Sequence, residues 1–454
     1  MHVIEPNMRR KNIRSRRRFK MWHGIVGLAL FLLVLYHITG SYKVRKRLQE
    51  LRAQGYPLAI EELNSMYTIP EGARNAADVY IAAFSYFKEW DKAGMSALSK
   101  ARSPARTEPL DDSARQLLEK FLSENQKTFT LLHEAASIEH CRYPIDLTKP
   151  LRFDNPLFNN ERNCGRLLHI DVLIQCDNNA PDKALASIRA NIMLAGSMNI
   201  PMSDCRLTYT ALRGWAYRDI QRVLNRITLS DEQLQNLSEW IKAPDIDKDF
   251  KRLLIAEQCL GLDTLRAPIR QIVSRTEYGK GMFLMLVPWK MLGLCYRDEL
   301  AFIDLMQDLI DAMDLPNPQR LTAFKRIEES INTGGRGGTL TGIIWPIHTY
   351  LFNIDVRHLA NLRTTQTALA VERYRLTEGR LPKSLDNLVP AYMDAIPDDP
   401  FDGSPLKYRV RQSGYVVYSV GEDQTDEGGT EQGTQGKDSR GKPLPYDLTF
   451  VVER

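Results

Sequence analysis

The longest apolar stretch lies near the start of the chain. Residues 21–39 (MWHGIVGLALFLLVLYHIT) contain no charged side chain. At about 1.5 Å per residue these helical residues reach roughly 28 Å, close to the thickness of bilayer hydrocarbon. Trp22 and Tyr36 lie near its two ends, where interfacial aromatic residues are common. The pattern predicts a transmembrane helix over residues 21–40.

Beyond residue 40, apolar positions recur every three or four residues up to about residue 378, which is the spacing of helices. Residues 75–90 form one such stripe. Residues 165–176 and 182–198 form a pair of stripes separated by a polar turn, but no similar pair follows at a fixed period. The pattern predicts an irregular helical domain over residues 41–332 rather than a regular solenoid.

Two capping boxes indicate where helices of this region begin. Ser113 and Gln116 have the spacing in which each side chain can hydrogen-bond the other residue's backbone, and Ser230 and Gln233 have it too. Each pair precedes an apolar stripe, so we predict a helix start at both places.

A glycine-rich segment separates this region from the C-terminal part. Residues 333–339 read TGGRGGT, with no strand predicted before them and no lysine after them. A phosphate-binding loop needs both features, so nucleotide binding is not expected. We predict a flexible hinge over residues 333–342.

The C-terminal part combines one long helical stripe with short β-type runs. The helix is predicted over residues 343–377, and Gly379 and Pro382 provide its stop signals. Strands are predicted over residues 406–411, 415–420 and 448–452. Gln412-Ser413-Gly414 is a hairpin turn between the first two strands.

The predicted fold class is mainly α: an N-terminal transmembrane helix, an irregular multi-helix domain, and a small α+β domain made of a long helix and a three-stranded antiparallel sheet. The boundaries are a basic tail (1–20), the transmembrane helix (21–40), the helical domain (41–332), the hinge (333–342) and the α+β domain (343–454).

Basic residues are concentrated before the apolar helix. The chain has 61 basic and 56 acidic residues, a net charge of +5, and eight of the basic residues lie among the first twenty. The remainder is nearly balanced, so no nucleic-acid partner is expected. Because the more basic flank of a membrane helix stays in the cytoplasm, we predict an inner (cytoplasmic) membrane protein. Residues from about 42 onward would lie in the periplasm or otherwise outside the cytoplasm.

Two other interpretations of the N-terminus stay open. A cleaved signal peptide has the same layout, with Thr39-Gly40-Ser41 as its small-residue site. Residues 15–20 (SRRRFK) are also similar to a twin-arginine export signal, although a polybasic flank contains paired arginines as well.

An ordered set of motifs fills the C-terminal segment. The sequence EGRLP (378–382) ends the long helix, and IPDDP (396–400), FDGSPLKY (401–408) and YSVGED (418–423) follow in that order. This set resembles the C-terminal globular part of the major pseudopilin of type II secretion systems, over about 90 of the 454 residues. The resemblance implies the same α+β module and a link to secretion or pilus-like machinery.

In that family the loop after the Tyr-Ser-hydrophobic-Gly segment binds calcium. The resemblance implies calcium here, with Asp423, Asp426 and Asp447 as ligands. The residues agree, because five acids and no cation lie among residues 422–431, and the glycines would let oxygen ligands converge on Ca²⁺. Asp426 is displaced from the family spacing, however, and the stretch to Asp447 is longer. The alternative is a solvated acidic loop without metal.

The N-terminus departs from that family. A pseudopilin has a short leader and a glutamate five residues into its apolar helix, but residues 24–29 (GIVGLA) contain no glutamate. Roughly three hundred residues separate the apolar helix from the resemblance. We therefore expect a chain that carries the module without being processed or assembled as a pilus subunit.

No catalytic motif is evident. His133-Glu134 lacks the second histidine of the helical zinc-protease motif, no Gly-x-Ser-x-Gly elbow occurs, and the six cysteines include no Cys-x-x-Cys pair. We expect a non-catalytic, single-pass bacterial envelope protein that acts as a scaffold or adaptor for protein partners. Two alternatives stay open: a helical module that binds peptides or envelope polymers, and an exported enzyme with a site in the helical domain.

Overall fold

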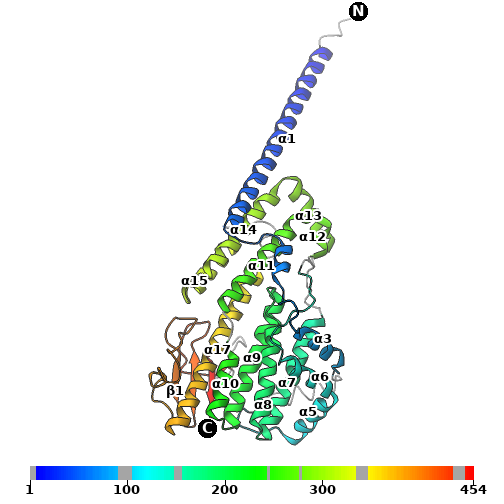
Figure 1. The fold of residues 1–454 in the computed structure, drawn as a ribbon. Helices are drawn as coiled ribbons and strands as arrows, with labels where there is room; N and C mark the ends of the chain where they lie inside the picture. Colours follow the sequence, from blue (N-terminus) through cyan, green and yellow to red (C-terminus); the bar gives the residue numbers. More distant parts are fainter. Residues whose placement is uncertain are drawn as a thin grey trace, which may run out of the picture. The chain divides into compact units, whose positions relative to one another are not determined.

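The computed structural model describes residues 7–89, 105–147, 156–242, 246–275, 279–333, 346–432 and 445–454 (Figure 1). Contacts divide the chain into two compact units. The first contains Met1–Ile60, Gln258–Gln307 and Ser330–Trp345, and the second contains Glu61–Glu257, Asp308–Glu329 and Pro346–Arg454. The hinge predicted over residues 333–342 lies outside the described residues from position 334 onward.

The first unit begins with α1, one continuous helix over Asn7–Ala53. From Met21 this helix is long and apolar enough to cross a membrane, and no residue of its most apolar window is buried. Within the described ranges it is the one helix with these properties, which fit a membrane anchor or a signal sequence. Past residue 40 the same helix enters the core of the unit, where Val44 and Leu51 are buried.

The rest of the first unit is also helical. It contains α12 (Ile269–Arg275), α13 (Gly279–Met291) and most of α14 (Leu294–Ala312), together with the last part of α11 (Ile246–Arg266). α11 and α14 pack closely at Gly261, because a Cβ atom there would lie 2.1 Å from the Cζ atom of Phe302. α15 (Gln319–Asn332) contributes its last residues to this unit.

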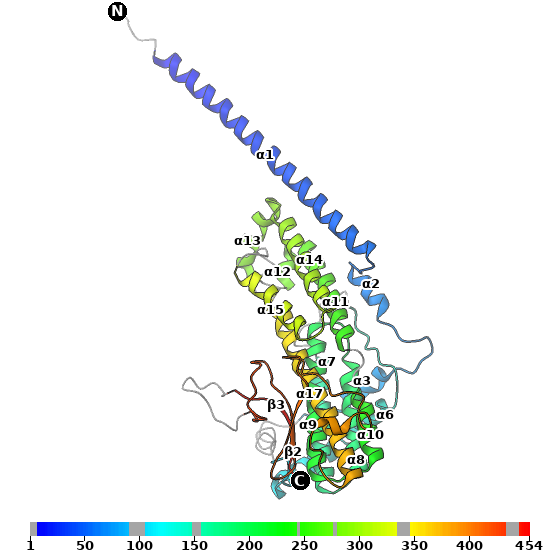
Figure 2. The same cartoon turned by 90° about the vertical axis from the view of Figure 1, so that its left-hand side faces the viewer.

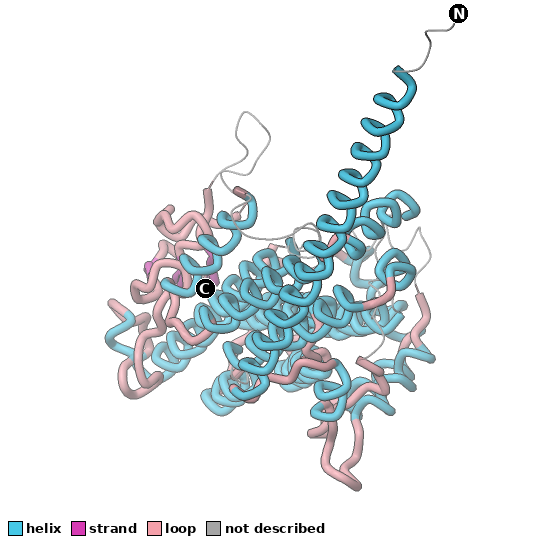
Figure 3. Tube along the Cα trace, turned by 90° about the horizontal axis from the view of Figure 1, so that it is seen from above, coloured by secondary structure: helices cyan, strands magenta, loops and turns pink. Residues whose placement is uncertain are grey.

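The second unit is a layered set of helices (Figure 2). The helices that lie in this unit almost entirely are α2 (Ile60–Met66), α3 (Ala76–Tyr86), α5 (Asp112–Glu124), α6 (Gln126–Ala135), α7 (Pro156–Asp177), α8 (Pro181–Ser197), α9 (Ser203–Arg226), α10 (Asp231–Ile241) and α17 (Pro346–Glu378). The first part of α11, the end of α14 and most of α15 belong to it as well. A short 3-10 turn, η1 (Leu385–Leu388), follows α17. In Figure 3, helices make up most of the described chain and the strands occupy one small region. The mainly helical prediction is confirmed.

The two predicted capping boxes have different outcomes. Ser230 forms its box with Gln233 at the start of α10, as predicted. Ser113 does not cap a helix, because α5 begins one residue before it and the Asp111 carboxylate accepts the N–H of Ala114 (2.9 Å). The Ser113 hydroxyl instead donates to the same carboxylate. A serine inside the first turn cannot compete with an aspartate already at the cap position.

The predicted three-stranded antiparallel sheet is present. β1 (Lys407–Val410), β2 (Tyr415–Ser419) and β3 (Leu448–Val452) lie in the order β1-β2-β3. Gly414 closes the hairpin with φ +76°, and a Cβ atom there would lie 1.8 Å from the carbonyl oxygen of Val452. The turn therefore requires glycine both for its left-handed backbone and for the close passage of β3.

The sheet is part of the same hydrophobic core as the helices. One cluster of buried side chains includes Leu224 of α9, Leu237 of α10, Leu369 of α17, Val417 of β2 and Phe450 of β3. A polar contact supports the arrangement, since the side-chain amide of Asn225 donates to the Val451 carbonyl and accepts the Glu453 N–H (both 2.8 Å). α9 is therefore fastened to the edge of β3.

Candidate functional site

Asp447, one of the three predicted calcium ligands, lies immediately before β3. It is only 1% exposed, and its carboxylate accepts the backbone N–H groups of Gly429 (2.7 Å) and Thr430 (3.2 Å). Burial raises the pKa of Asp447 to about 6 in spite of these hydrogen bonds. These hydrogen bonds hold the loop that follows β2 against Asp447.

The other two predicted ligands have partners of their own. The Asp426 carboxylate accepts the Tyr418 hydroxyl (3.1 Å) and lies 3.3 Å from the Lys407 Nζ atom. The Asp423 carboxylate accepts the N–H of Thr425 (3.2 Å). Thus Asp426 is neutralised by a lysine, whereas Asp447 is engaged with the backbone.

This donor set does not form a calcium cage in the described conformation. Over the described residues, no three acidic, histidine or cysteine side chains gather as a metal ion would require. Residues 433–444, which belong to the same loop, lie outside the description. Calcium binding by Asp423, Asp426 and Asp447 therefore stays a prediction.

A different site, not predicted from the sequence, lies against α7 and α9 of the second unit. It is a cavity of about 540 Å³ that we call the arginine pocket. Four arginines and two carboxylates are among the side chains that line it: Arg106, Arg166, His169, Leu173, Trp215, Arg218, Asp219, Gln221, Arg222 and Glu431.

Helical spacing places these residues on facing sides of the two helices. On α7, His169 follows Arg166 by three positions, and on α9 Arg218 and Arg222 follow Trp215 by three and seven. Such positions share one face of a helix.

Gly165 lets α7 and α9 approach each other closely, because a Cβ atom there would lie 2.3 Å from a methyl group of Leu212.

A histidine–aspartate pair is part of the lining of the arginine pocket. The Nδ1 atom of His169 lies 2.5 Å from Oδ1 of Asp219, whose side chain is 1% exposed. A neutral imidazole that donates from Nδ1 keeps Nε2 as its acceptor, and a protonated ring donates from both nitrogens. The other Asp219 oxygen is buried with no hydrogen-bond partner among the described residues.

The arginines differ in how fully they are paired. Arg106 forms an ion pair with Glu431 and another with Glu453 (3.2 Å). Arg222 donates to the carbonyl oxygens of Ala105 (2.9 Å) and Glu108 (2.7 Å). Arg218 is exposed and makes no hydrogen bond or ion pair within the described part of the chain, although the nearby Asp219 carboxylate attracts its charge.

The chemistry of this lining favours an anion. An arginine presents five N–H donors in a planar fork that suits carboxylate and phosphate groups. Buried donors of Arg106 (Nη1) and Arg222 (Nε) have no partner among the described residues. Trp215 and Leu173 add apolar surface on one side. The described lining contains no serine, threonine or cysteine that could act as a nucleophile.

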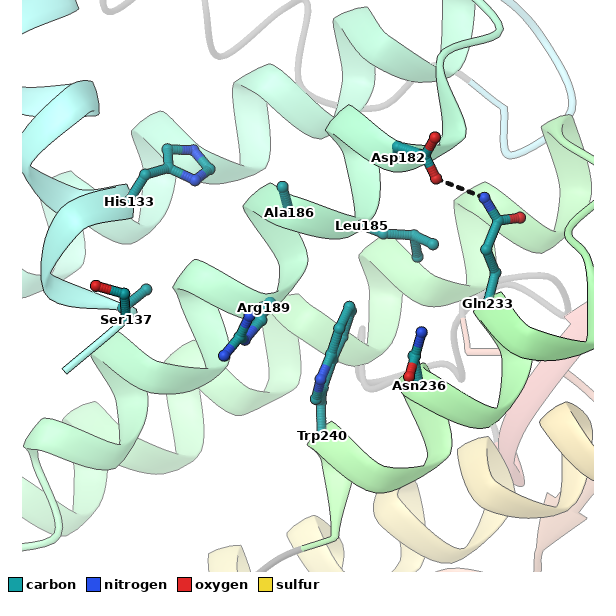
Figure 4. A pocket seen from close by; sticks show the side chains of 10 residues that line it. His133, Ser137, Asp182, Leu185, Ala186, Arg189, Gln233, Asn236 and Trp240 are labelled. Atoms are coloured by element: carbon teal, nitrogen blue, oxygen red, sulfur yellow. Dashed lines mark hydrogen bonds between the residues drawn. The ribbon is translucent and has the colours of Figure 1, made fainter. Parts of the chain in front are cut away.

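A second, smaller pocket of about 240 Å³ lies between α8 and α10 and differs in chemistry. In Figure 4, Arg189 lies over the ring of Trp240, 5.6 Å from its centroid, and Asp182 accepts a hydrogen bond from the Gln233 amide (2.7 Å). Its arginine is stacked on an aromatic ring, and no second arginine lines it.

A buried glutamate lies elsewhere on α7. Glu161 is 0% exposed and accepts hydrogen bonds from the hydroxyls of Tyr143 and Ser197 (3.1 Å). Burial raises the pKa of Glu161 to about 8, so its carboxyl group is largely protonated at neutral pH. It lines neither pocket described above.

No family model, curated protein or solved structure matches this chain. The function is therefore argued from the chain's own residues. The sequence does contain a signal for the arginine pocket, namely arginines at helical spacing in two predicted helices. The same spacing is also typical of helix faces that are simply exposed to solvent. Only the packing of α7 against α9 distinguishes the two.

Proposed function

We propose that this protein is a membrane-anchored binding protein whose second unit takes an anionic small molecule in the arginine pocket. The observation that carries the proposal is the presence of Arg166, Arg218 and Arg222 around one cavity, where Arg218 has the nearby charge of Asp219 but no hydrogen bond or ion pair among the described residues. Asp219 and Glu431 offset part of the positive charge of the lining, and an anionic ligand would offset the remaining repulsion between the arginines. This role belongs to the class of helical binding modules.

The size and lining of the pocket narrow the ligand class. A volume of about 540 Å³ suits a small molecule rather than a folded partner. The arginines favour one or two phosphate or carboxylate groups, and Trp215 favours a flat or apolar body beside them. We therefore propose a phosphate- or carboxylate-bearing metabolite or the charged end of an envelope polymer.

The location of the protein is part of the same proposal. The apolar part of α1 serves as a single uncleaved span, the basic N-terminus stays in the cytoplasm, and the residues from about 42 onward lie on the periplasmic side. The asymmetry of basic residues across the span supports this orientation. A protease added to intact spheroplasts would then digest the residues that follow the span and leave a cytosolic control untouched.

A scaffold or adaptor role near secretion machinery is a second proposal. A long helix, α17, followed by a small antiparallel sheet supports the resemblance to the pseudopilin module. So does Asp399 of the IPDDP motif, which is buried and accepts the Ser419 hydroxyl (2.9 Å) and the Val420 N–H (2.7 Å) of the YSVGED motif. Co-purification of secretion components from detergent-solubilised membranes tests it.

The binding proposal is tested on the full chain purified in detergent. Inorganic phosphate, pyrophosphate and citrate are titrated by calorimetry at matched ionic strength. We expect at least one of them to bind, and Arg218→Gln to weaken that binding roughly tenfold or more, as loss of a charge-assisted hydrogen bond of about 1.5–3 kcal/mol implies.

Arg189→Gln in the smaller pocket is the matched control and should bind as the unmodified chain does. Equal affinity of the Arg218→Gln and unmodified chains would contradict the proposal. So would the absence of binding by all three probes.

A further inference from the structure

The exposed face of α13 is apolar, which is unusual for a helix that borders water. Four of its neighbouring large side chains are exposed: Leu284 (79%), Met285 (38%), Met291 (68%) and Leu292 (50%). Leu284, Met285 and Met291 lie at positions i, i+1 and i+7 of α13, on one side of the helix, and Leu292 follows in the turn directly after it.

The opposite face of α13 is apolar as well, but it is covered by protein. Leu286 is 0% exposed and Trp289 is 3% exposed, and the Trp289 indole donates to the Asp298 carboxylate (2.8 Å). Lys290 turns its ammonium group inward, where it donates to the Ala267 carbonyl (2.6 Å). Packing within the unit therefore accounts for the apolar side chains of the inner face. Among the described residues, nothing covers the outer stripe.

The end of α13 lies against the last turns of the apolar part of α1. The ring of His37 lies 3.0 Å, through Nε2, from the carbonyl oxygen of Met291. A Cβ atom at Gly293 would lie 3.0 Å from the ring of Tyr36. A Cβ atom at Gly40 would lie 2.9 Å from the ring of Tyr296, the third residue of α14.

These contacts set the depth of α13 relative to the apolar part of α1. Tyr36 marks the C-terminal end of that part, where a spanning helix passes from hydrocarbon to headgroups. A helix of 13 residues is too short to cross a bilayer. An apolar stripe at this depth fits a helix that lies in the interface.

We propose that α13 is a second membrane contact, with Leu284, Met285, Met291 and Leu292 inserted among the lipid acyl chains of the leaflet from which α1 emerges. The inference rests on the proposed span of α1. In this arrangement the first unit contacts the bilayer through α13 as well as through α1. Lipid is the occupant because Met291, which belongs to the stripe, contacts His37 at the end of the apolar part of α1.

Depth-dependent fluorescence quenching tests this inference on the full chain. p-Azidophenylalanine replaces Leu284 or Met291, and an environment-sensitive fluorophore is attached to it, so that the native cysteines need not be changed. The protein is reconstituted into phosphatidylethanolamine–phosphatidylglycerol vesicles that carry nitroxides either near the headgroup or deep in the acyl chain. Leu30, within the apolar part of α1, and Ile81, which is 42% exposed on α3, provide reference positions.

We expect positions 284 and 291 to be quenched several-fold more by the shallow nitroxide than position 81, and position 30 to be quenched most by the deep one. Quenching at position 30 without quenching at 284 and 291 would overturn the inference and leave the span intact. No quenching at position 30 would contradict the span itself. Equal quenching at position 81 would mean that lipid contact is not specific to α13, and would also overturn the inference.

Discussion

The Nδ1 atom of His169 on α7 lies 2.5 Å from the Oδ1 atom of Asp219 on α9. This contact joins two helices within the lining of the arginine pocket and fixes which ring nitrogen remains for a ligand. Because Asp219 is buried, the pair contributes to stability as well as to the site. Its two roles can be separated by experiment.

Asp219→Ala should destabilise the protein by roughly 1–3 kcal/mol, because it leaves His169 without its buried partner. The free energy of unfolding measured in urea checks this expectation. Asp394→Ala provides the control, since Asp394 is exposed and should change stability by no more than about 0.5 kcal/mol. Equal stability of the two variants would show that the His169–Asp219 contact contributes nothing.

Glu161 predicts a pH dependence of stability. Its pKa is raised from the ordinary value of 4.5 to about 8, so between these values the folded chain holds a proton that the unfolded chain has released. The free energy of unfolding therefore falls as pH rises from about 4.5 to 8, by at most about 1.4 kcal/mol per pH unit from this group.

Glu161→Gln removes the ionisable group and should flatten the pH profile over this window, with its largest relative gain at pH 8. Urea unfolding at pH 5, 6, 7 and 8, chosen as roughly even steps across the window, measures the slope. Glu119→Gln, on the exposed side of α5, should keep the original slope. An unchanged slope in Glu161→Gln would refute the assignment.

Two glycines should respond in opposite ways to alanine. Gly414→Ala should destabilise the protein by roughly 1–3 kcal/mol, because its φ is +76° and its Cβ atom would meet the Val452 carbonyl. Gly196→Ala, near the end of α8 with open space around it, should instead stabilise by up to about 1 kcal/mol. Thermal unfolding of the two variants side by side distinguishes these effects from a general sensitivity to substitution.

Calcium binding is tested by the melting temperature of the full chain in excess calcium and in EGTA. If the loop after β2 binds the ion, calcium should raise the melting temperature by on the order of 5 °C. Asp447→Asn should abolish that difference, whereas Asp394→Asn should not. The same melting temperature in both solutions would show that the acidic loop is solvated and free of metal.

Local sequence signals predicted local structure well where one signal acted alone. Ser230 caps α10 with Gln233, and Gly414 closes the hairpin between β1 and β2. At Ser113 the prediction was wrong because Asp111, two residues earlier, was the better acceptor at the cap position. Competing caps so close together cannot be ranked from spacing alone.

The sequence by itself determined the apolar helix of α1, the mainly helical middle, and the long helix and three strands of the C-terminal segment. These features follow from periodicity and turn chemistry, which act over a few neighbouring residues. Tertiary structure alone decided that Arg166 and His169 of α7 meet Trp215, Arg218 and Asp219 of α9, and that Met291 lies beside His37. Residues some 50 to 250 positions apart are joined by packing, which depends on the whole chain at once.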